Sequence, residues 1–585
     1  MTPVAWSFCR AEKRALASLP PISGHCIAAA IAALTLLIVT LGCGGGESSQ
    51  GSRQPPSFTL SSSPGTVILQ QQASATIQVS VVPAHGFNAS VSLSASGLPS
   101  GVTATFDPPS TTSTSTMTLT ISGSAPTGAA AITVTGASGS LAPTTAVNLT
   151  VLLAPPPGSL PQSFFALNNV DPTDDPTADG MLYGAVGHPI RLAWPYIETS
   201  KGVFDFSFYD EYAAIAPKEG AGGTVAVMDL TLGMTPSWAV ANQSTCRTLN
   251  GGATGCQAAP DDIQDWKDFI TALVNHYNGV TAPHIKYYEI WNEWNVNDAQ
   301  NGFWSGTDVD LVNLQTAACT IIHGAAGDPF SQVLTPSTVG SARFAGDQAP
   351  AQLAAYFNAG GTSCPGAPNN LIDGVSFHGN VGIMSLAPYP LPGEGCPQSG
   401  CNGTIIQIAN SYRQVMNLNG LQADPLLDTE GGFEAAAISD NDQRAAWLAQ
   451  FYVLQAGLLN SDQLQWNSWF TWGAPGVAGN IETSSRKPNS SGVAYNQVFD
   501  WLFGRFPAPC AQSGKVWTCS LTGSSGYQAQ ILWDDSQTCD SGTCTSTAQP
   551  SPTGAVKFRD LAGNTTQITG TSIPVGLKPI IIENQ

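Results

Sequence analysis

The sequence predicts a (β/α)8 TIM barrel that is preceded and followed by a β-sandwich, and three observations lead to this fold class. The chain has 585 residues, which is too long for one domain. Residues 161–505 alternate strand-like apolar runs with helical patterns, as parallel barrels do. Residues 57–153 and 506–585 contain short runs in which apolar and polar residues alternate, which is the period of half-buried strands.

The first 43 residues predict export. Arg10, Lys13 and Arg14 precede an apolar run that is too short for a membrane span and has the layout of a signal peptide. The residues before Cys43 resemble the lipobox of bacterial lipoproteins, in which that cysteine is lipidated after cleavage. We therefore expect a lipid anchor in the bacterial cell envelope, or simple secretion. Residues 44–56, rich in Gly and Ser, would form a flexible tether.

Residues 57–153 predict a separate sandwich. Asp107 is their only charged residue, and they contain no Trp or Tyr. The segment resembles bacterial immunoglobulin-like extracellular modules, notably at residues 97–103. We expect a spacer. A carbohydrate-binding module is the alternative, but stacking on sugars requires aromatic side chains, and the segment has only three Phe. Residues 154–160, rich in Pro, would form a stiff linker.

Residues 161–505 contain eight candidate strands, and helical patterns between several of them. Residues 262–274 and 442–454 are apolar at the spacing of one helical face. An open doubly wound sheet is the alternative, but no Gly-rich phosphate loop follows the first strand. In residues 506–585 apolar and polar residues again alternate as in strands, and we expect this segment to form the C-terminal sandwich. The eight candidate strands are residues 163–167, 189–193, 224–229, 285–291, 332–335, 374–378, 424–428 and 465–470.

Cysteine spacing agrees with export, because short loops closed by disulfides suit an oxidising compartment. The sequence does not decide whether Cys319 and Cys364 pair or remain thiols. The cysteine spacings and the seven His residues indicate no metal site, and no nucleotide or flavin motif is present, so we expect neither a metal nor a cofactor. The short-range pairs are Cys246/Cys256, Cys396/Cys401, Cys510/Cys519 and Cys539/Cys544.

Charge and composition limit the possible partners. Only 10% of the residues are charged, and the formal net charge is −20. Nucleic acids and acidic polymers require clustered Lys and Arg, so we expect no nucleic acid partner. A neutral carbohydrate fits this balance. We expect a monomer that acts on such a substrate.

Two carboxylates follow strand-like runs and are followed by loop residues. These are Glu293, after residues 285–291, and Glu430, after residues 424–428. Parallel barrels place their chemistry at the C-terminal ends of strands. Cleavage of a glycosidic bond requires one carboxyl that protonates the leaving oxygen, and another that attacks the anomeric carbon or activates water. The sequence therefore predicts a glycosidase.

Glu289 would lie deeper in the barrel than Glu293. Side chains alternate along a strand, so Glu289, Trp291 and Glu293 share one face. A buried carboxylate requires a cationic or hydrogen-bonding partner, and Arg191 on the second candidate strand is the expected one. Arg191 could equally reach upward and orient the nucleophile, so both roles stay open.

Residues 290–295 and 427–431 resemble the fourth-strand and seventh-strand motifs of clan A glycoside hydrolases. The overall pattern looks most like glycoside hydrolase family 39 and its bacterial relatives, from about residue 160 to the C-terminus. The resemblance implies a retaining enzyme in which Glu430 is the nucleophile and Glu293 the general acid/base. Further matching segments are residues 191–192, 197–198, 202–206, 235–239, 492–498 and 501–502.

The same resemblance implies a set of substrate-binding residues. Asn292 would bind the sugar 2-hydroxyl, His378 would lie beside Glu430, and Trp472 would form the floor under the reacting sugar. Trp238 offers a second aromatic face, and Trp291 offers apolar surroundings for the acid/base. Core packing is the alternative for each Trp.

Two positions depart from the family pattern, so the family's usual sugar preference cannot be assumed. Asn380 stands where many relatives have Tyr, and Gly473 stands where an acidic residue is common. Within enzymes, endo-glucanase, mannanase and arabinofuranosidase activities are alternatives. A non-catalytic polysaccharide-binding or adhesion protein that keeps the barrel is the alternative from another class.

Overall fold

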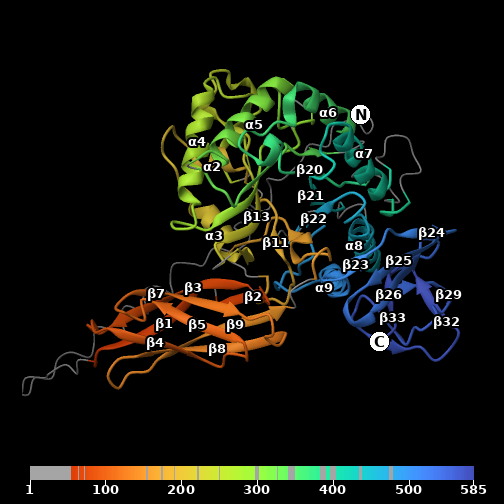
Figure 1. Ribbon diagram of the computed structural model, residues 1–585, viewed down its shortest axis with the longest axis horizontal. Coiled ribbons are helices and arrows are strands. Elements are labelled where there is room, and N and C mark those ends of the chain that lie inside the picture. The colour runs from red at the N-terminus through yellow and green to blue at the C-terminus, as the bar shows by residue number, and fades with distance from the viewer. Residues whose placement is uncertain are drawn as a thin grey trace, which may run out of the picture. The chain divides into compact units, whose positions relative to one another are not determined.

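The structure is a computed structural model that describes residues 54–585 except for several segments (Figure 1). The expected signal peptide, Cys43 and the Cys396/Cys401 pair lie outside the described residues. No helix of the described part is long and apolar enough to cross a membrane. The segments not described are residues 64, 72, 153–155, 173–175, 190, 221–222, 250, 297–301, 326, 340–348, 382–389, 395–402, 434–437 and 474–478.

The N-terminal segment forms two sheets that share one apolar core. Alternate residues of each strand are buried, as at Ile77, Val79 and Val81, because successive side chains point to opposite faces. One sheet has the order β1(Ser57–Ser63), β3(Ser74–Ala84), β7(Thr114–Ile121), β5(Val102–Asp107). The other has the order β2(Thr66–Gln70), β9(Thr144–Leu152), β8(Gly128–Ala137), β4(Val91–Ser96), β6(Ser110–Thr111).

The central part is a curled sheet of parallel strands, as in a TIM barrel. A parallel bridge between Leu334 and Gly374 joins the edge strand β18 to the segment before β20. Residues Lys218–Glu219 (β12) pair antiparallel with β13. The order is β18(Gln332–Leu334), β17(His284–Glu289), β13(Val225–Thr231), β11(Ala185–Val186), β10(Phe165–Leu167), β22(Leu464–Trp469), β21(Leu426–Gly431), β20(Val375–His378), β19(Thr338–Val339).

The second candidate strand is misplaced in the sequence analysis. Residues 189–193 were expected to be a strand, but the strand β11 is Ala185–Val186 and helix α2 begins at Ala193. Pro189 has no N–H to donate to a neighbouring strand, which disfavours a strand interior at this point. The other seven candidate strands overlap strands of the sheet.

The helices follow the strands, and several begin at a side-chain cap. Asp262 accepts a hydrogen bond from the Gln264 amide at the start of α4, and Asp440 caps α8 in the same way. Both helices predicted from the sequence are present. The helices are α2(Ala193–Ile197), α3(Ser207–Ile215), α4(Ile263–His276), α5(Asp308–Ile322), α6(Ala349–Tyr356), α7(Ile405–Leu418), α8(Asn441–Ala456) and α9(Ser490–Leu502), with a π-helical turn at Phe357–Gly361.

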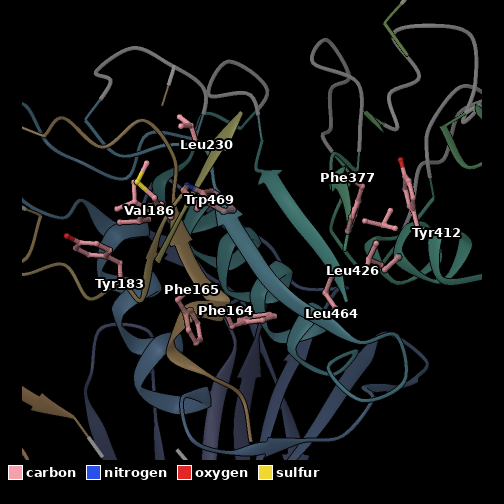
Figure 2. Close-up of a cluster of buried hydrophobic side chains, with 14 of the residues drawn as sticks. Phe164, Phe165, Tyr183, Val186, Leu230, Phe377, Tyr412, Leu426, Leu464 and Trp469 are labelled. Atoms are coloured by element: carbon pink, nitrogen blue, oxygen red, sulfur yellow. The ribbon is translucent and has the colours of Figure 1, made fainter. Parts of the chain in front are cut away.

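The strands of the sheet are buried on both faces, as expected for parallel strands that are covered by helices. In β21, Leu427 belongs to a small inner cluster with Trp466, while its neighbour Leu426 belongs to the large outer core. Figure 2 shows part of that outer core, where Phe377 of β20 lies beside Tyr412 of α7. This two-sided packing holds the strand ends, and thus the side chains at those ends, in fixed positions.

The C-terminal segment is a set of antiparallel strands that contacts α8. Gln450 of α8 donates to the Leu577 carbonyl at 2.9 Å, and Lys578 pairs with Asp442 at 2.8 Å. The main sheet contains β23(Phe506–Pro507), β24(Ala511–Ser513), β25(Val516–Thr522), β26(Gln528–Asp534), β33(Ile580–Glu583), β30(Lys557–Arg559) and β31(Thr565–Gln567). Two strand pairs accompany it, β27(Cys539–Asp540) with β28(Thr543–Cys544) and β29(Ser546–Pro550) with β32(Ser572–Gly576).

Four disulfides are present in the described residues. Cys319 and Cys364, which the sequence left open, are bonded to each other and connect α5 to the loop after the π-helical turn. The expected short-range bonds Cys246–Cys256, Cys510–Cys519 and Cys539–Cys544 are confirmed. The first of them joins β15(Cys246–Thr248) to β16(Thr254–Cys256), which pairs with β14(Thr235–Pro236).

Candidate active site

Two carboxylates lie at the rim where parallel strands end. Glu293 follows β17 by four residues, has a backbone φ of +37°, and its amide donates to Ser337 Oγ at 3.1 Å. Glu430 is the next-to-last residue of β21. Their side chains are 19% and 21% exposed. Solvent and substrate can therefore reach both carboxylates, although most of their surroundings are buried.

His378, the last residue of β20, connects the two carboxylates. Its Nδ1 lies 2.9 Å from Glu293 Oε1 and 3.9 Å from Glu430 Oε2, and its ring is fully buried. These two oxygens cannot be farther apart than the two distances added together. The separation of these two oxygens is therefore bounded, although Glu293 and Glu430 are 137 residues apart in the sequence and β18 and β20 lie between their strands.

His188 also contacts the candidate nucleophile, and sequence reasoning missed it. Its Nε2 lies 3.0 Å from Glu430 Oε2, and its Nδ1 lies 3.2 Å from the Pro189 carbonyl oxygen. Its ring is stacked with that of His378 at a centroid distance of 6.1 Å. A signal was present, because His188 lies two residues after the second strand once that strand is placed at Ala185–Val186.

Opposite charges set the protonation of this cluster. Burial acts to lower the pKa of His378, but the charge of Glu430 and the contact with Glu293 raise it to about 10. Burial likewise opposes the charged form of His188, and Glu430 outweighs it, so the pKa of His188 is raised. Burial alone would raise the pKa of Glu430, but His378 and His188 hold it below its usual value. Glu430 is therefore ionised at neutral pH, as a nucleophile must be.

Glu289 lies beneath this cluster in the barrel interior, as expected, and is fully buried. Its carboxylate accepts hydrogen bonds from three hydroxyls on three other strands of the sheet, β13, β20 and β21. Thr231 Oγ1 donates at 3.3 Å and Thr429 Oγ1 at 2.9 Å, and Ser376 Oγ is the third donor. These bonds replace the water that a buried carboxylate loses.

The expected ion pair between Arg191 and Glu289 is wrong. The Arg191 guanidinium lies over the ring of Phe208, 4.1 Å from its centroid, and 5.4 Å from that of Tyr196. Among the described residues it forms no ion pair with Glu430 either. The misplaced second strand explains the error, because Arg191 lies between β11 and α2 and not on a strand.

Two further buried carboxyls differ in how they are satisfied. Asp428 accepts from the Gly379 amide at 2.9 Å and from Gln455 Nε2 at 2.8 Å, and burial raises its pKa to about 7. Asp229 is fully buried, and neither of its oxygens has a hydrogen-bond partner in the described residues. Burial, and then the charge of Glu289, raise the pKa of Asp229 well above its usual value.

Several buried polar groups around the rim have no partner in the described part of the chain. They are Asn292 Oδ1, His378 Nε2, Trp472 Nε1 and both side-chain atoms of Asn169. Asn169 was missed in the sequence, although it lies two residues after β10. Gly473 has a φ of +82° and lies against the backbone of Asn169. The acidic residue that is common there in relatives would be strained in this backbone.

The tryptophans are more buried than expected. Trp291 has no exposed surface, donates from Nε1 to the Phe303 carbonyl at 2.8 Å, and packs edge-on against Trp304. Its contacts are those of core packing, the alternative that the sequence left open for each Trp. Trp472 also has no exposed surface in the structure. Trp238 is half-buried and donates to the Glu198 carbonyl at 2.7 Å.

Two groups of side chains in the described residues have the composition of a metal site. One is the cluster of His188, His378 and Glu430, whose ligand atoms all lie within 4.8 Å of one another. The other includes Cys364, but its sulfur is bonded to Cys319 and provides no thiolate. The first group can thus bind a divalent ion only at the expense of the contacts of Glu430.

No protein-family model matches the chain, and the comparison with curated proteins finds no similar sequence. The fold is TIM-barrel-like. It resembles a family 39 glycoside hydrolase from the gut symbiont Bacteroides cellulosilyticus WH2 at a TM-score of 0.52 and 14% identity, over 90% of this chain and 99% of the other. At this identity the likeness establishes the fold alone.

Two other solved structures align less well. A monomeric β-xylosidase from Caulobacter crescentus CB15 aligns at a TM-score of 0.46 and 15% identity, over 73% of this chain and 97% of that one. A family 5 xyloglucanase from Bacteroides ovatus aligns at a TM-score of 0.36 and 12% identity, over 76% of this chain and 100% of that one.

Proposed function

We propose that the protein is a retaining glycoside hydrolase that cleaves an extracellular poly- or oligosaccharide, with Glu430 as nucleophile and Glu293 as general acid/base. One observation carries the proposal. Two partly exposed carboxylates from the ends of β17 and β21 meet at one imidazole nitrogen of His378.

The bounded separation of the carboxylates supports a retaining mechanism. Retaining enzymes hold the two carboxyl groups about 5–5.5 Å apart, and inverting enzymes hold them about 6.5–9.5 Å apart to make room for a water. Oxygens that lie 2.9 and 3.9 Å from one nitrogen reach, at most, the lower edge of the inverting range. Direct attack by Glu430 fits this distance better than attack by an interposed water.

The reaction would proceed in two steps. Glu430 attacks the anomeric carbon while Glu293 protonates the departing glycosidic oxygen, which leaves a glycosyl ester on Glu430. Glu293 then removes a proton from water, the water oxygen attacks the anomeric carbon, and Glu430 leaves as a carboxylate. The contact between His378 Nδ1 and Glu293 Oε1 holds the Glu293 carboxyl in place at the rim.

The unpartnered groups at the rim fit a ligand that carries many hydroxyls. Asn292 Oδ1 and Asn169 can accept from sugar hydroxyls, and Trp472 Nε1 and Asn169 can donate to them. Buried polar atoms without partners are rare in folded proteins. A bound sugar would satisfy them, and the 2-hydroxyl is the group that we assign to Asn292.

The finer assignments belong to the same proposal. The paired Glu motifs support membership in clan A, most like family 39. We further propose that Cys43 carries a lipid anchor in the bacterial cell envelope and that residues 57–153 act as a spacer, with domain borders at residues 161 and 505 for the barrel. The carbohydrate substrate requires no cofactor in this mechanism.

The test is reducing-end release from a panel of polysaccharides and aryl glycosides by the chain without its first 43 residues. We expect release by the parent and by the control Glu211→Gln, which removes an exposed carboxylate of α3. Glu430→Gln should lose at least about 10³-fold in rate, as expected when a nucleophile is removed. Binding of a polysaccharide without release by any of the three proteins would instead favour a binding or adhesion protein.

A further inference from the structure

The contacts of the two ring nitrogens of His188 indicate which of them carries a hydrogen. Its Nδ1 lies 3.2 Å from the Pro189 carbonyl oxygen, which can only accept, so Nδ1 carries a hydrogen. Its Nε2 lies 3.0 Å from Glu430 Oε2. One proton must lie between these two atoms, because a bare nitrogen would repel a bare carboxylate oxygen at this distance. The open question is whether the ring or the carboxyl holds it.

The surroundings of His188 favour the proton on the ring. Its side chain is 6% exposed, so charges near it act with little screening by water. Glu430 of β21 and Glu289 of β17 face it as carboxylates, and Asp229 of β13 adds a third when ionised. The ring of His378 of β20 is stacked on it and opposes a second positive charge. The negative charges of Glu430 and Glu293 therefore offset the positive charges of the His188 and His378 rings. Glu289, which lies beneath them, adds a third carboxylate.

We propose that His188 is a positioning residue whose imidazolium donates to Glu430 Oε2, holds that carboxylate ionised, and aims its other oxygen at the substrate. The inference rests on the proposed function of Glu430. It assigns to His188 the role of orienting the nucleophile, which the sequence left open for Arg191. A ring that donates from both nitrogens to fixed acceptors cannot rotate without losing a hydrogen bond, so it also fixes the carboxylate plane.

The same imidazolium would act in both chemical steps without giving up its proton. In the first step, Glu430 uses its electron pair to form the ester bond, and the leaving oxygen takes its proton from Glu293. In the second step, water attacks the anomeric carbon, its proton passes to Glu293, and the ester bond breaks. The positive ring then stabilises the negative charge that returns to Glu430.

The first test reads the protons directly and requires no substrate. The chain from residue 44 is labelled with nitrogen-15 in histidine, and the His188 resonances are assigned by their loss in His188→Gln or, if that variant does not fold, by their change in Glu430→Gln. We expect both ring nitrogens of His188 to be protonated at pH 7. A ring with one unprotonated nitrogen at pH 7 would overturn the proposal, whether or not the protein proves to be a glycosidase.

The second test uses kinetics on whichever glycoside the enzyme cleaves. Gln can still donate a hydrogen bond but has no charge, so His188→Gln should lower kcat/KM by about 10²-fold. It should also move the acid limb of the pH profile to higher pH, because Glu430 becomes easier to protonate. The matched control is His323→Gln, which breaks a 2.8 Å pair with Asp373 away from the site. An acid limb that stays in place in His188→Gln would contradict the charged role.

Discussion

At the scale of single residues, the candidate site is a row of alternating charges. His188, Glu430, His378 and Glu293 follow one another through contacts of 3.0, 3.9 and 2.9 Å. Each imidazole thus contacts at least one carboxylate, and the two carboxylates differ in the number of imidazoles that they contact. Glu430 has two rings and Glu293 has one, and this asymmetry fits a nucleophile that stays ionised beside an acid that exchanges its proton.

The two carboxylates should give different phenotypes when they are replaced. Glu293→Gln should slow the hydrolysis of a glycoside with a poor leaving group by about 10²–10⁴-fold, because no acid protonates the departing oxygen. It should slow a dinitrophenyl glycoside much less, since that group leaves without a proton. Glu430→Gln should lose both activities. The kcat/KM values of both variants on both substrates decide the assignment, and equal losses in all four would contradict it.

Asp229 should reduce stability more as the pH rises. Its pKa is raised on folding by burial and by Glu289, so the folded state holds a proton that the unfolded chain releases above about pH 4. Asp229→Asn removes this proton uptake and keeps the shape. We expect the Tm to rise relative to the parent at pH 7, with little difference at pH 4. A gain of equal size at both pH values would show that the effect has another cause.

Asp534 provides the opposite case as a control. Burial alone would raise its pKa, but hydrogen bonds from Ser536 and Thr547 hold it below its usual value. Its contribution to stability is therefore present above its unfolded pKa and is lost as the pH falls. Asp534→Asn should lower the Tm more at pH 7 than at pH 4, which is the reverse of the result for Asp229→Asn.

The local motifs were sufficient to identify the two carboxylates as candidates, but not the groups that hold them. Glu293 and Glu430 stand beside strand-like runs, so their places follow from nearby residues. The partners of Glu289 are hydroxyls on three other strands, and nothing in the sequence marks Ser376 or Thr429 as its donors. Burial of Trp291 likewise depends on Phe303, which lies beyond the motif.

At the scale of elements, short strands were the hardest to place. The strand β11 has two residues, and its position decides which side chain lies at its C-terminal end. Longer elements such as α4 and α8 could be predicted, because their apolar periods extend over several turns and Asp262 and Asp440 mark their starts. A two-residue strand has no period to detect.

The disulfides should differ in how much they stabilise the fold. The Cys319–Cys364 bond spans 45 residues and the Cys539–Cys544 bond spans 5. Closing the longer loop removes more freedom from the unfolded chain, which gives about 4 kcal/mol against about 2 kcal/mol. Replacing each pair by Ser and measuring unfolding in urea should show the larger loss for Cys319–Cys364. Equal losses would indicate that chain entropy does not dominate.

At the scale of the whole chain, the two sandwich segments differ in how they relate to the barrel. The core of the N-terminal sandwich is a cluster of its own, whereas the outer core of the barrel continues into the C-terminal strands through Trp517 and Trp533. Gln450 of α8 is fully buried, and its amide donates to Leu577 of that segment. The barrel and the C-terminal strands are therefore one folding unit.

Deleting the two segments should consequently have different results. A chain that ends at residue 505 leaves Gln450 without its acceptor and uncovers the apolar side of α8, so we expect an insoluble or loosely folded protein. A chain that begins at residue 158 keeps the barrel core intact and should cleave small glycosides as the parent does. Gel filtration and limited proteolysis distinguish the two outcomes. A soluble, active chain that ends at residue 505 would contradict the shared core.

The composition of the N-terminal sandwich has a practical consequence. Between Arg53 and Arg191 the chain contains neither Lys nor Arg. Trypsin therefore has no bond to cut there, even when the protein is unfolded, and releases residues 54–191 as a single large peptide. A survey by tryptic peptides would detect this protein through its barrel and its C-terminal strands, which contain Lys515, Lys557 and Arg559. Its N-terminal sandwich would be observed only with a protease that cuts beside apolar residues.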